Sequence, residues 1–280
     1  MNNTGMISLA ITIANFIFSI KGFNDRAFFD KYAFRVERIL LFKEYHRLVT
    51  SGFLHVNWQH LIFNMLSLLA FSWLLEADLG AGAFLLIYFG SLIGGDLLSL
   101  LIHRHTGDYS SVGASGAICG VIFACIALFP GMEVSFFGLL AIPGWLYGIL
   151  YTGYAIYGIT SHRDNIGHDA HLGGALIGMG LAAIIAPQAM LANLATCITI
   201  MVPCIFFMYV IISKPHILLV DNFFYKQHHA VGDIDDRYVF ERANRQKELD
   251  AILEKIHQKG INSLSKAERE KLERYSQQIK

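Results

Sequence analysis

The sequence predicts an all-α protein that crosses a membrane several times and ends in a soluble helical tail. Of the 280 residues, 54% are hydrophobic and only 16% are charged, whereas an ordinary soluble domain has about a quarter charged. Nine Asp, Glu, Lys or Arg residues lie between Met65 and Ile212, while the last 67 residues hold 24 of the chain's 44. These observations exclude a water-soluble globular enzyme over most of the length and a disordered chain. A nucleic-acid binder is also excluded, because the net charge is zero and the apolar part has no basic block.

Seven apolar runs account for the membrane part. A bilayer core of about 30 Å takes roughly 20 residues of helix, and most runs come close to that length. They are Thr4–Ile20, Val56–Leu75, Ala81–Ile102, Gly113–Phe129, Pro143–Thr160, His168–Ala186 and Asn193–Ser213. The first six predict six membrane helices. The seventh predicts an added helix even though it contains Pro203, because neighbouring helices can satisfy the backbone groups that a proline frees.

The remaining segments complete the predicted domain organisation. Residues 21–54 mix aromatic side chains with seven basic ones, a composition typical of a loop at the membrane interface. Residues 249–256 repeat apolar positions at helical spacing, and Ser265 to Glu268 is a capping box, so the tail predicts a helical hairpin. We therefore expect a membrane core over 1–190 with its interfacial loop, an extra transmembrane helix over 191–213 and a soluble tail over 221–280. The four cysteines lack C-x-x-C spacing, so neither a zinc site nor a disulfide framework is indicated.

Polar side chains inside the apolar runs are the informative residues, because burying them in lipid costs a few kcal/mol each. The second, fourth and sixth runs carry them near their starts: His55, Asn57, His60 and Asn64, then Ser115, then His168, Asp169 and His171. Consecutive membrane helices alternate in direction, so these three helices run parallel. The sequence therefore predicts that His60, Asn64, Ser115 and His171 lie near one depth in the bilayer.

Spacing strengthens this prediction. His60 and Asn64 are four residues apart and share a helix face. Small-residue stripes, Gly116-x-x-x-Gly120 and Gly174-x-x-x-Gly178, allow the fourth and sixth helices to pack closely. Close packing would bring the Ser115 hydroxyl within hydrogen-bonding reach of His171, the arrangement of a nucleophile and its general base. Each signal alone has an ordinary structural explanation, such as a serine bonded to its preceding turn or a histidine that relays protons. Their coincidence at one depth is what indicates catalysis.

These motifs resemble those of the rhomboid family of intramembrane serine proteases, over residues from about 44 to 180. The matching motifs are His55 with His60-x-x-x-Asn64, Gly113-Ala-Ser115-Gly116, Ala170-His171-Leu-Gly-Gly174-x-x-x-Gly178 and, with His46 where the family usually has Trp, Glu44-Tyr-His46-Arg47. The resemblance implies a six-helix core with Ser115 as nucleophile and His171 as base. It also implies an oxyanion site made by His60, Asn64 and the Ser115 backbone N–H, with His55, Gly113, Gly116 and Gly174 in supporting roles. The family often has an aromatic residue four positions after the nucleophile that stacks on the base, and here that position is Cys119.

The expected reaction is hydrolysis of peptide bonds in or next to transmembrane segments of membrane-protein substrates. We expect a Ser115–His171 dyad without a carboxylate, since Asp169 points to another helix face and Asp96 is better read as an independent polar contact. No cofactor is implied, and metal catalysis is not indicated because His-Glu-x-x-His is absent. The Gly-rich run Pro143–Thr160 suits a lateral gate for the substrate.

Two alternatives stay open. One is a catalytically inactive rhomboid-like protein that binds or escorts membrane helices. The other is a transporter with a His/Asn/Asp proton path, against which the lack of a visible inverted repeat speaks. The expected partners are substrate transmembrane segments and the lipid bilayer, with no nucleic acid. The expected location is the bacterial plasma membrane, since no organelle-targeting segment is visible. Residues 21–47 carry seven basic and four acidic side chains, so the positive-inside rule places this loop in the cytoplasm, whereas the resemblance places it outside.

Overall fold

A computed structural model describes residues 5–104, 106–136, 140–161 and 166–213, together with 252, 255–256 and 264–265 of the tail. The chain forms two compact units, residues 1–220 and 221–280. The helical hairpin predicted for the tail lies outside the described residues, apart from those isolated positions. Most of the described residues of the first unit are helical, which confirms the predicted all-α membrane fold.

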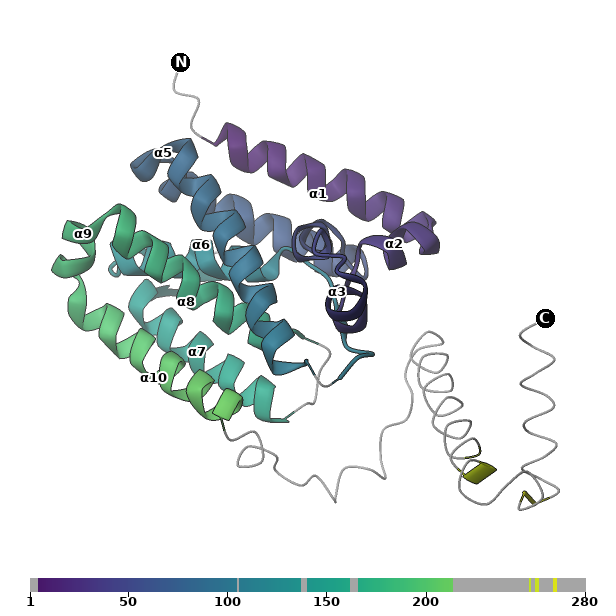
Figure 1. The fold of residues 1–280 in the computed structure, drawn as a ribbon. Coiled ribbons are helices and arrows are strands. Elements are labelled where there is room, and N and C mark those ends of the chain that lie inside the picture. The colour runs from purple at the N-terminus through teal and green to yellow at the C-terminus, as the bar shows by residue number, and fades with distance from the viewer. Residues whose placement is uncertain are drawn as a thin grey trace. The chain divides into compact units, whose positions relative to one another are not determined.

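The apolar runs correspond to the long helices in Figure 1. These are α1 (Met6–Asn24), α5 (Trp58–Ile102), α6 (Ser115–Leu128), α7 (Gly144–Ser161), α8 (His168–Ile185) and α10 (Leu194–Ser213), with the short α9 (Pro187–Ala192) before α10. Among the described residues, α1, α5, α8 and α10 are long and apolar enough to cross a membrane. The helix α5 spans the second and third predicted runs and is broken at Gly80, where φ is 81° and ψ is 166°. Only glycine adopts this backbone conformation without strain.

The helix α8 lies at the centre of the first unit, with α5 and α6 on one side and α7 and α10 on the other (Figure 1). Its contact with α6 is made through glycine. A Cβ atom at Gly174 would collide with the carbonyl oxygen of Gly116, and one at Gly178 would collide with the backbone of Gly120. The two small-residue stripes therefore pack against each other as the sequence predicts, backbone against backbone.

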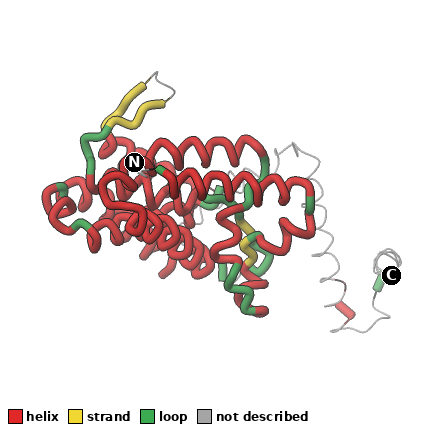
Figure 2. The backbone as a smooth tube through the Cα atoms, turned by 90° about the horizontal axis from the view of Figure 1, so that it is seen from above, coloured by secondary structure: helices red, strands yellow, loops and turns green. Residues whose placement is uncertain are grey.

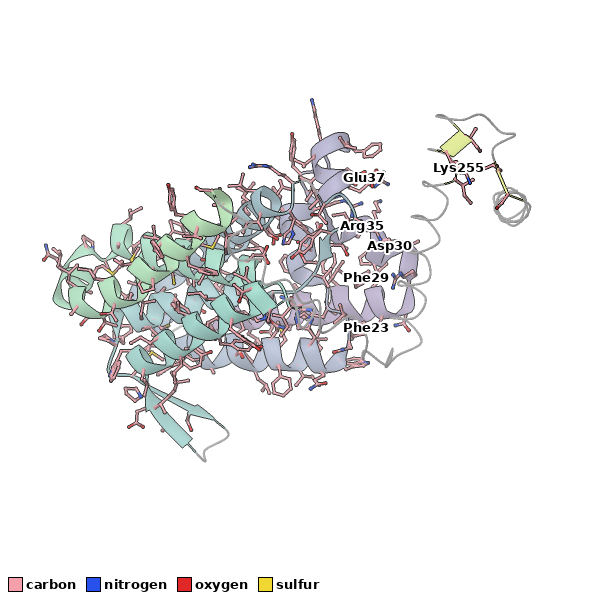
Figure 3. The ribbon with its side chains drawn as sticks, turned by 90° about the horizontal axis from the view of Figure 1, so that it is seen from below. Phe23, Phe29, Asp30, Arg35, Glu37 and Lys255 are labelled. Atoms are coloured by element: carbon pink, nitrogen blue, oxygen red, sulfur yellow. The ribbon has the colours of Figure 1, made fainter. Side chains whose placement is uncertain are left out.

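Residues 21–54 are more regular than an interfacial loop. The helix α1 continues to Asn24, and the segment then forms α2 (Arg26–Tyr32), β1 (Phe34–Arg35), α3 (Val36–Phe42), α4 (Arg47–Thr50) and the 3₁₀ helix η1 (Ser51–Phe53). Asp25 separates α1 from α2 because its side chain accepts the Phe28 backbone N–H at 3.0 Å, an N-cap bond. Figure 3 labels Phe23, Phe29, Asp30 and Arg35 along this segment, where Arg35 Nη2 donates to Asp30 Oδ1 at 2.7 Å.

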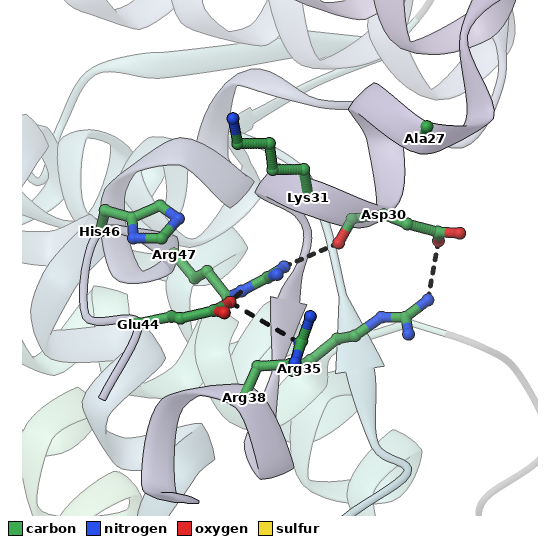
Figure 4. A pocket seen from close by; sticks show the side chains of 8 residues that line it. All are labelled: Ala27, Asp30, Lys31, Arg35, Arg38, Glu44, His46 and Arg47. Atoms are coloured by element: carbon green, nitrogen blue, oxygen red, sulfur yellow. Dashed lines mark hydrogen bonds and ion pairs between the residues drawn. The ribbon is translucent and has the colours of Figure 1, made fainter. Parts of the chain in front are cut away.

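Arg47 holds this segment together. Its side chain is almost fully buried, and Nε donates to Glu44 Oε2 at 2.6 Å. Its Nη1 donates to the carbonyl oxygens of Asp30 at 2.8 Å and Ala33 at 2.6 Å. The Arg47 hydrogen bond holds the pKa of the Glu44 carboxyl below its ordinary value. Both side chains line an open cavity of about 430 Å³, with the other lining residues Ala27, Asp30, Lys31, Arg35, Arg38 and His46 (Figure 4).

Two pairs of short strands were not predicted. The strand β1 pairs with β2 (Ser110–Ser111), so that Phe34 lies opposite Ser111 just before α6. The strands β3 (Glu133–Phe136) and β4 (Leu140–Pro143) form an antiparallel hairpin between α6 and α7, which projects from the helices in Figure 2. The alternation of Val134, Ser135 and Phe136 was the available signal, but three residues are too few to separate a strand from the end of an apolar helix.

Candidate active site

Ser115 and His171 meet where the helices α6 and α8 begin. Ser115 is the first residue of α6, and His171 is the fourth of α8. The distance from His171 Nε2 to Ser115 Oγ is 2.6 Å, a short hydrogen bond. Both side chains are only partly buried. The glycine contacts determine this proximity, since the carbonyl oxygen of Gly116 occupies the place that a Cβ atom at Gly174 would take.

His60 lies on the other side of the loop that precedes Ser115. A Cβ atom at Gly113 would be 2.7 Å from His60 Cε1 and 3.6 Å from Ser115 Oγ, so this glycine separates the two side chains. Its φ of 131° is also a conformation that favours glycine. The backbone N–H of Gly113 donates to the Ser51 carbonyl oxygen at 3.0 Å, and the Ser51 hydroxyl donates to the Arg47 carbonyl oxygen at 2.6 Å. The Arg47 segment therefore supports the loop before Ser115.

Asn64 shares the helix face of His60 but bonds within α5. Its Nδ2 donates to the His60 carbonyl oxygen at 2.8 Å, and its side chain is buried. No hydrogen bond joins Asn64 to Ser115 in the described part of the chain. At the start of the helix, the Asn57 side chain accepts the His60 backbone N–H at 2.8 Å and caps α5. The structure thus brings His60 next to Ser115 and leaves Asn64 one turn further along α5.

His55 lies behind His60. The two rings meet edge to face with centroids 4.9 Å apart, and His55 Nδ1 is 2.9 Å from the Ser19 hydroxyl of α1. Burial lowers the pKa of the fully buried His55 imidazole to about 3, and the nearby His60 contributes in the same direction. His55 is therefore neutral at physiological pH and supports His60 by packing.

One residue of the site was missed by the sequence analysis. The Tyr151 hydroxyl of α7 is 3.0 Å from His171 Nδ1 and 3.1 Å from Cys119 Sγ. The Tyr151 and His171 rings are tilted by 32° with centroids 6.5 Å apart. The aromatic partner of His171 thus comes from another helix than the one that carries Cys119. The available signal was a stripe of tyrosines at helical spacing, Tyr147, Tyr151 and Tyr154.

The two buried carboxyl groups nearby have other partners. Asp96 Oδ2 lies 3.0 Å from the Ser51 hydroxyl oxygen, and Asp169 Oδ2 lies 3.2 Å from His103 Nε2. Each of these carboxyl groups thus has a partner other than His171. Among the described residues, no group of three His, Cys, Asp or Glu is arranged to hold a metal ion. His105 and His162, which follow α5 and α7 in the sequence, lie outside the described residues.

Comparison with known proteins gives two family matches. The Rhomboid domain matches residues 43–188 and a family of unknown function, DUF6576, matches residues 232–278. The first covers all the residues of the candidate site. The second falls within the compact unit of residues 221–280.

Three curated relatives illustrate the similarity. The chain is 29% identical over 147 residues to RHOMBOID-like protein 12, mitochondrial, of Arabidopsis thaliana, covering 47% of this chain and 44% of the relative. It is 33% identical over 137 residues to Rhomboid protein 1, mitochondrial, of Saccharomyces cerevisiae, covering 47% and 39%. It is 44% identical over 78 residues to the putative rhomboid protease YdcA of Bacillus subtilis, covering 28% and 38%. The matches thus span less than half the length of each of these relatives. Because the Rhomboid domain covers more than half of the chain and contains the Ser115–His171 pair, the chain belongs to the rhomboid family, as an integral membrane protein.

Proposed function

We propose that the protein is an intramembrane serine endopeptidase that hydrolyses peptide bonds in or next to transmembrane segments of membrane-protein substrates. The observation that carries this proposal is the 2.6 Å distance between Ser115 Oγ and His171 Nε2, at a position where both side chains are partly exposed. His171 takes the proton from Ser115 as the serine oxygen attacks the scissile carbonyl, and then gives it to the leaving amine. This dyad needs neither a metal nor a cofactor.

The tetrahedral intermediate needs donors for its oxyanion. The Ser115 backbone N–H is the first of α6, and such groups lack a partner within their own helix and lie at its positive end. His60 supplies a second donor from across Gly113. Asn64 supplies a third once its amide turns from the His60 carbonyl oxygen toward the site. Removing one donor of this kind typically costs about 3–4 kcal/mol of transition-state stabilisation.

Two relatives with protease in their names support this function: the putative rhomboid protease YdcA, and the Rhomboid protease GluP of Bacillus subtilis, which is 33% identical to this chain over 140 residues. Both come from a bacterium, which also supports residence in a bacterial plasma membrane. Other matched relatives are mitochondrial or chloroplastic by name. Separating plasma-membrane vesicles and detecting the protein there tests this part of the proposal.

The central test compares wild type, Ser115→Ala and His171→Ala in lipid vesicles. Each is treated with a fluorophosphonate, which labels activated serines, and with a single-span membrane protein as substrate. We expect labelling and cleavage by the wild type, and losses of about a thousand-fold or more in both variants. Labelling that persists in Ser115→Ala would contradict the proposal. So would a wild type that binds the transmembrane segment without labelling or cleavage, which is the behaviour of an inactive helix-binding rhomboid.

The same assay with Asn64→Ala tests the oxyanion site. We expect turnover to fall by about 10²–10³-fold, with melting in detergent close to that of the wild type. Unchanged cleavage would remove Asn64 from the oxyanion site and leave the dyad in place.

A further inference from the structure

The Tyr151 hydroxyl lies between the His171 imidazole and the Cys119 thiol. It is 3.0 Å from His171 Nδ1 and 3.1 Å from Cys119 Sγ. The three groups come from three helices, α7, α8 and α6. The site therefore contains a continuous hydrogen-bonded chain, Ser115–His171–Tyr151–Cys119.

The proton transfer from Ser115 to His171 determines which group donates and which accepts in each of these hydrogen bonds. For Ser115 to donate to His171 Nε2, a neutral imidazole must carry its proton on Nδ1. The Nδ1–H then donates to the Tyr151 oxygen, and the Tyr151 O–H donates to the Cys119 sulfur. In the opposite direction the tyrosine would donate to Nδ1, and the proton would sit on Nε2. The imidazole could then no longer accept the serine proton.

Cys119 favours the tautomer of His171 that carries its proton on Nδ1. A tyrosine oxygen accepts from Nδ1–H most readily when the tyrosine's own proton is donated to another acceptor. The Cys119 sulfur is such an acceptor, because it lies within hydrogen-bonding distance of the Tyr151 hydroxyl. The Cys119 side chain is almost fully buried, so water does not compete for that proton. Thiol sulfur is a weak acceptor, so its contribution is smaller than that of the tyrosine oxygen.

The tyrosine ring is itself held in place. The Phe123 ring of α6 lies edge-on to it with centroids 5.7 Å apart, and the Tyr147 ring stacks on it at 5.8 Å. These contacts leave the hydroxyl little freedom to turn away from His171. The tyrosine hydroxyl contacts the ring nitrogen of His171 that does not face Ser115, and such a partner orients a reactive imidazole.

We propose that Tyr151 is a positioning residue, whose hydroxyl, oriented by Cys119, holds His171 in the tautomer and ring orientation that activate Ser115. It occupies the place that a carboxylate fills in serine-protease triads. Its ring is tilted against His171 and not stacked on it, so it compensates for the aromatic residue absent at Cys119 through its hydroxyl. This inference rests on the proposed serine-protease function.

The first experiment removes only the hydroxyl. In vesicles, Tyr151→Phe is expected to lower the rate of fluorophosphonate labelling and kcat by about 10–100-fold, the usual cost of losing such a partner. KM should stay within about twofold, because the hydroxyl does not touch the substrate. The matched control is Tyr147→Phe, which removes a hydroxyl one turn away and keeps the stacked ring. It is expected to label at the wild-type rate.

The second experiment reads the tautomer directly. Nitrogen NMR of the ¹⁵N-histidine-labelled protein, with His171→Ala to identify the signals, should show the Nδ1–H form of His171 in the wild type. In Tyr151→Phe the signals should move toward a mixture of both tautomers. A merely structural role of the ring would leave these signals unchanged.

The third experiment tests the sulfur. Cys119→Ala is expected to slow labelling by about threefold, and Cys119→Ser, which keeps an acceptor, should retain the wild-type rate. Because both side chains act through one chain, Tyr151→Phe with Cys119→Ala should be no slower than Tyr151→Phe alone. Additive losses would overturn the role of Cys119.

The outcomes separate this inference from the proposed function. Wild-type labelling in Tyr151→Phe, or equal losses in Tyr151→Phe and Tyr147→Phe, would overturn the positioning role and leave the dyad standing. An unlabelled wild type would contradict the protease function. In that case the histidine NMR signals would still decide whether Tyr151 orients His171.

Discussion

The helix α8 contacts its neighbours in two different ways on its two sides. Toward α6, and at Gly95 of α5, the contacts are backbone to backbone, and an added Cβ atom at Gly174 or Gly178 would collide with the α6 main chain. Toward α7 they are made by side-chain ends, the Tyr151 hydroxyl on His171 and the Tyr154 ring on His168 at 5.0 Å between centroids. One side therefore fixes where α8 lies, and the other fixes how its histidines are turned.

The difference follows from the membrane environment. Lipid chains are as apolar as leucine side chains, so helices gain little from burying apolar area and depend on close packing. Glycine allows that packing but offers no functional group. Tyrosine keeps the helices further apart and provides a hydroxyl that can orient a neighbour. Substitutions that add one methyl group at different glycines should separate these contributions.

The largest effect is expected for Gly178→Ala on the glycine side. The new methyl group would collide with the Gly120 backbone, which cannot move without shifting α6. We expect a loss of about 3 kcal/mol or more in the free energy of unfolding, at the upper end for overpacking. Fluorophosphonate labelling should fall as well, although Gly178 lies two turns from His171. Unfolding in denaturing detergent measures the first effect, and a stability equal to wild type would refute the rigid contact.

A smaller loss in the free energy of unfolding is expected for Gly80→Ala, because the backbone conformation of this residue disfavours alanine. No atom lies within 4 Å of a Cβ built at Gly80, but its φ is +81°. We expect about 1–3 kcal/mol of destabilisation from backbone strain. Labelling of the folded fraction should keep the wild-type rate, because the break in α5 lies far along the chain from His60. Thermal melting and labelling of the same sample check both statements.

The smallest effect is expected for Gly153→Ala on α7, near the tyrosines. A Cβ atom there has no neighbour within 4 Å, and the residue lies inside a helix. The methyl group should change stability by less than about 1 kcal/mol, in the stabilising direction, because alanine restricts the unfolded chain more than glycine does. A large loss at Gly153 would show that this exposed face of α7 is packed and not open.

The membrane helices and the proximity of Ser115 to His171 could be predicted from the sequence, because their signals are local or depend on whether helices run parallel. Hydropathy located the long helices, and helix direction together with the glycine stripes placed Ser115 near His171. Tyr151 was not accessible, because α7 is apolar around most of its circumference and its pattern does not reveal which face meets α8. The hairpin β3–β4 was missed because short strands leave little periodicity. The position of the Asn64 amide depends on a side-chain rotation that spacing does not determine.

The helix α6 is short for a membrane helix. Its 14 residues extend about 21 Å at 1.5 Å per residue, against a hydrocarbon core of about 30 Å. A helix of this length cannot reach both surfaces, so the chain that continues from one of its ends must run through the membrane without helical hydrogen bonds. Such backbone is stable only when enclosed by protein or facing a water-filled recess. At the Ser115 end, the segments around Ser51 and His60 provide this enclosure, so the loop before Ser115 can lie below the lipid surface although it is not helical.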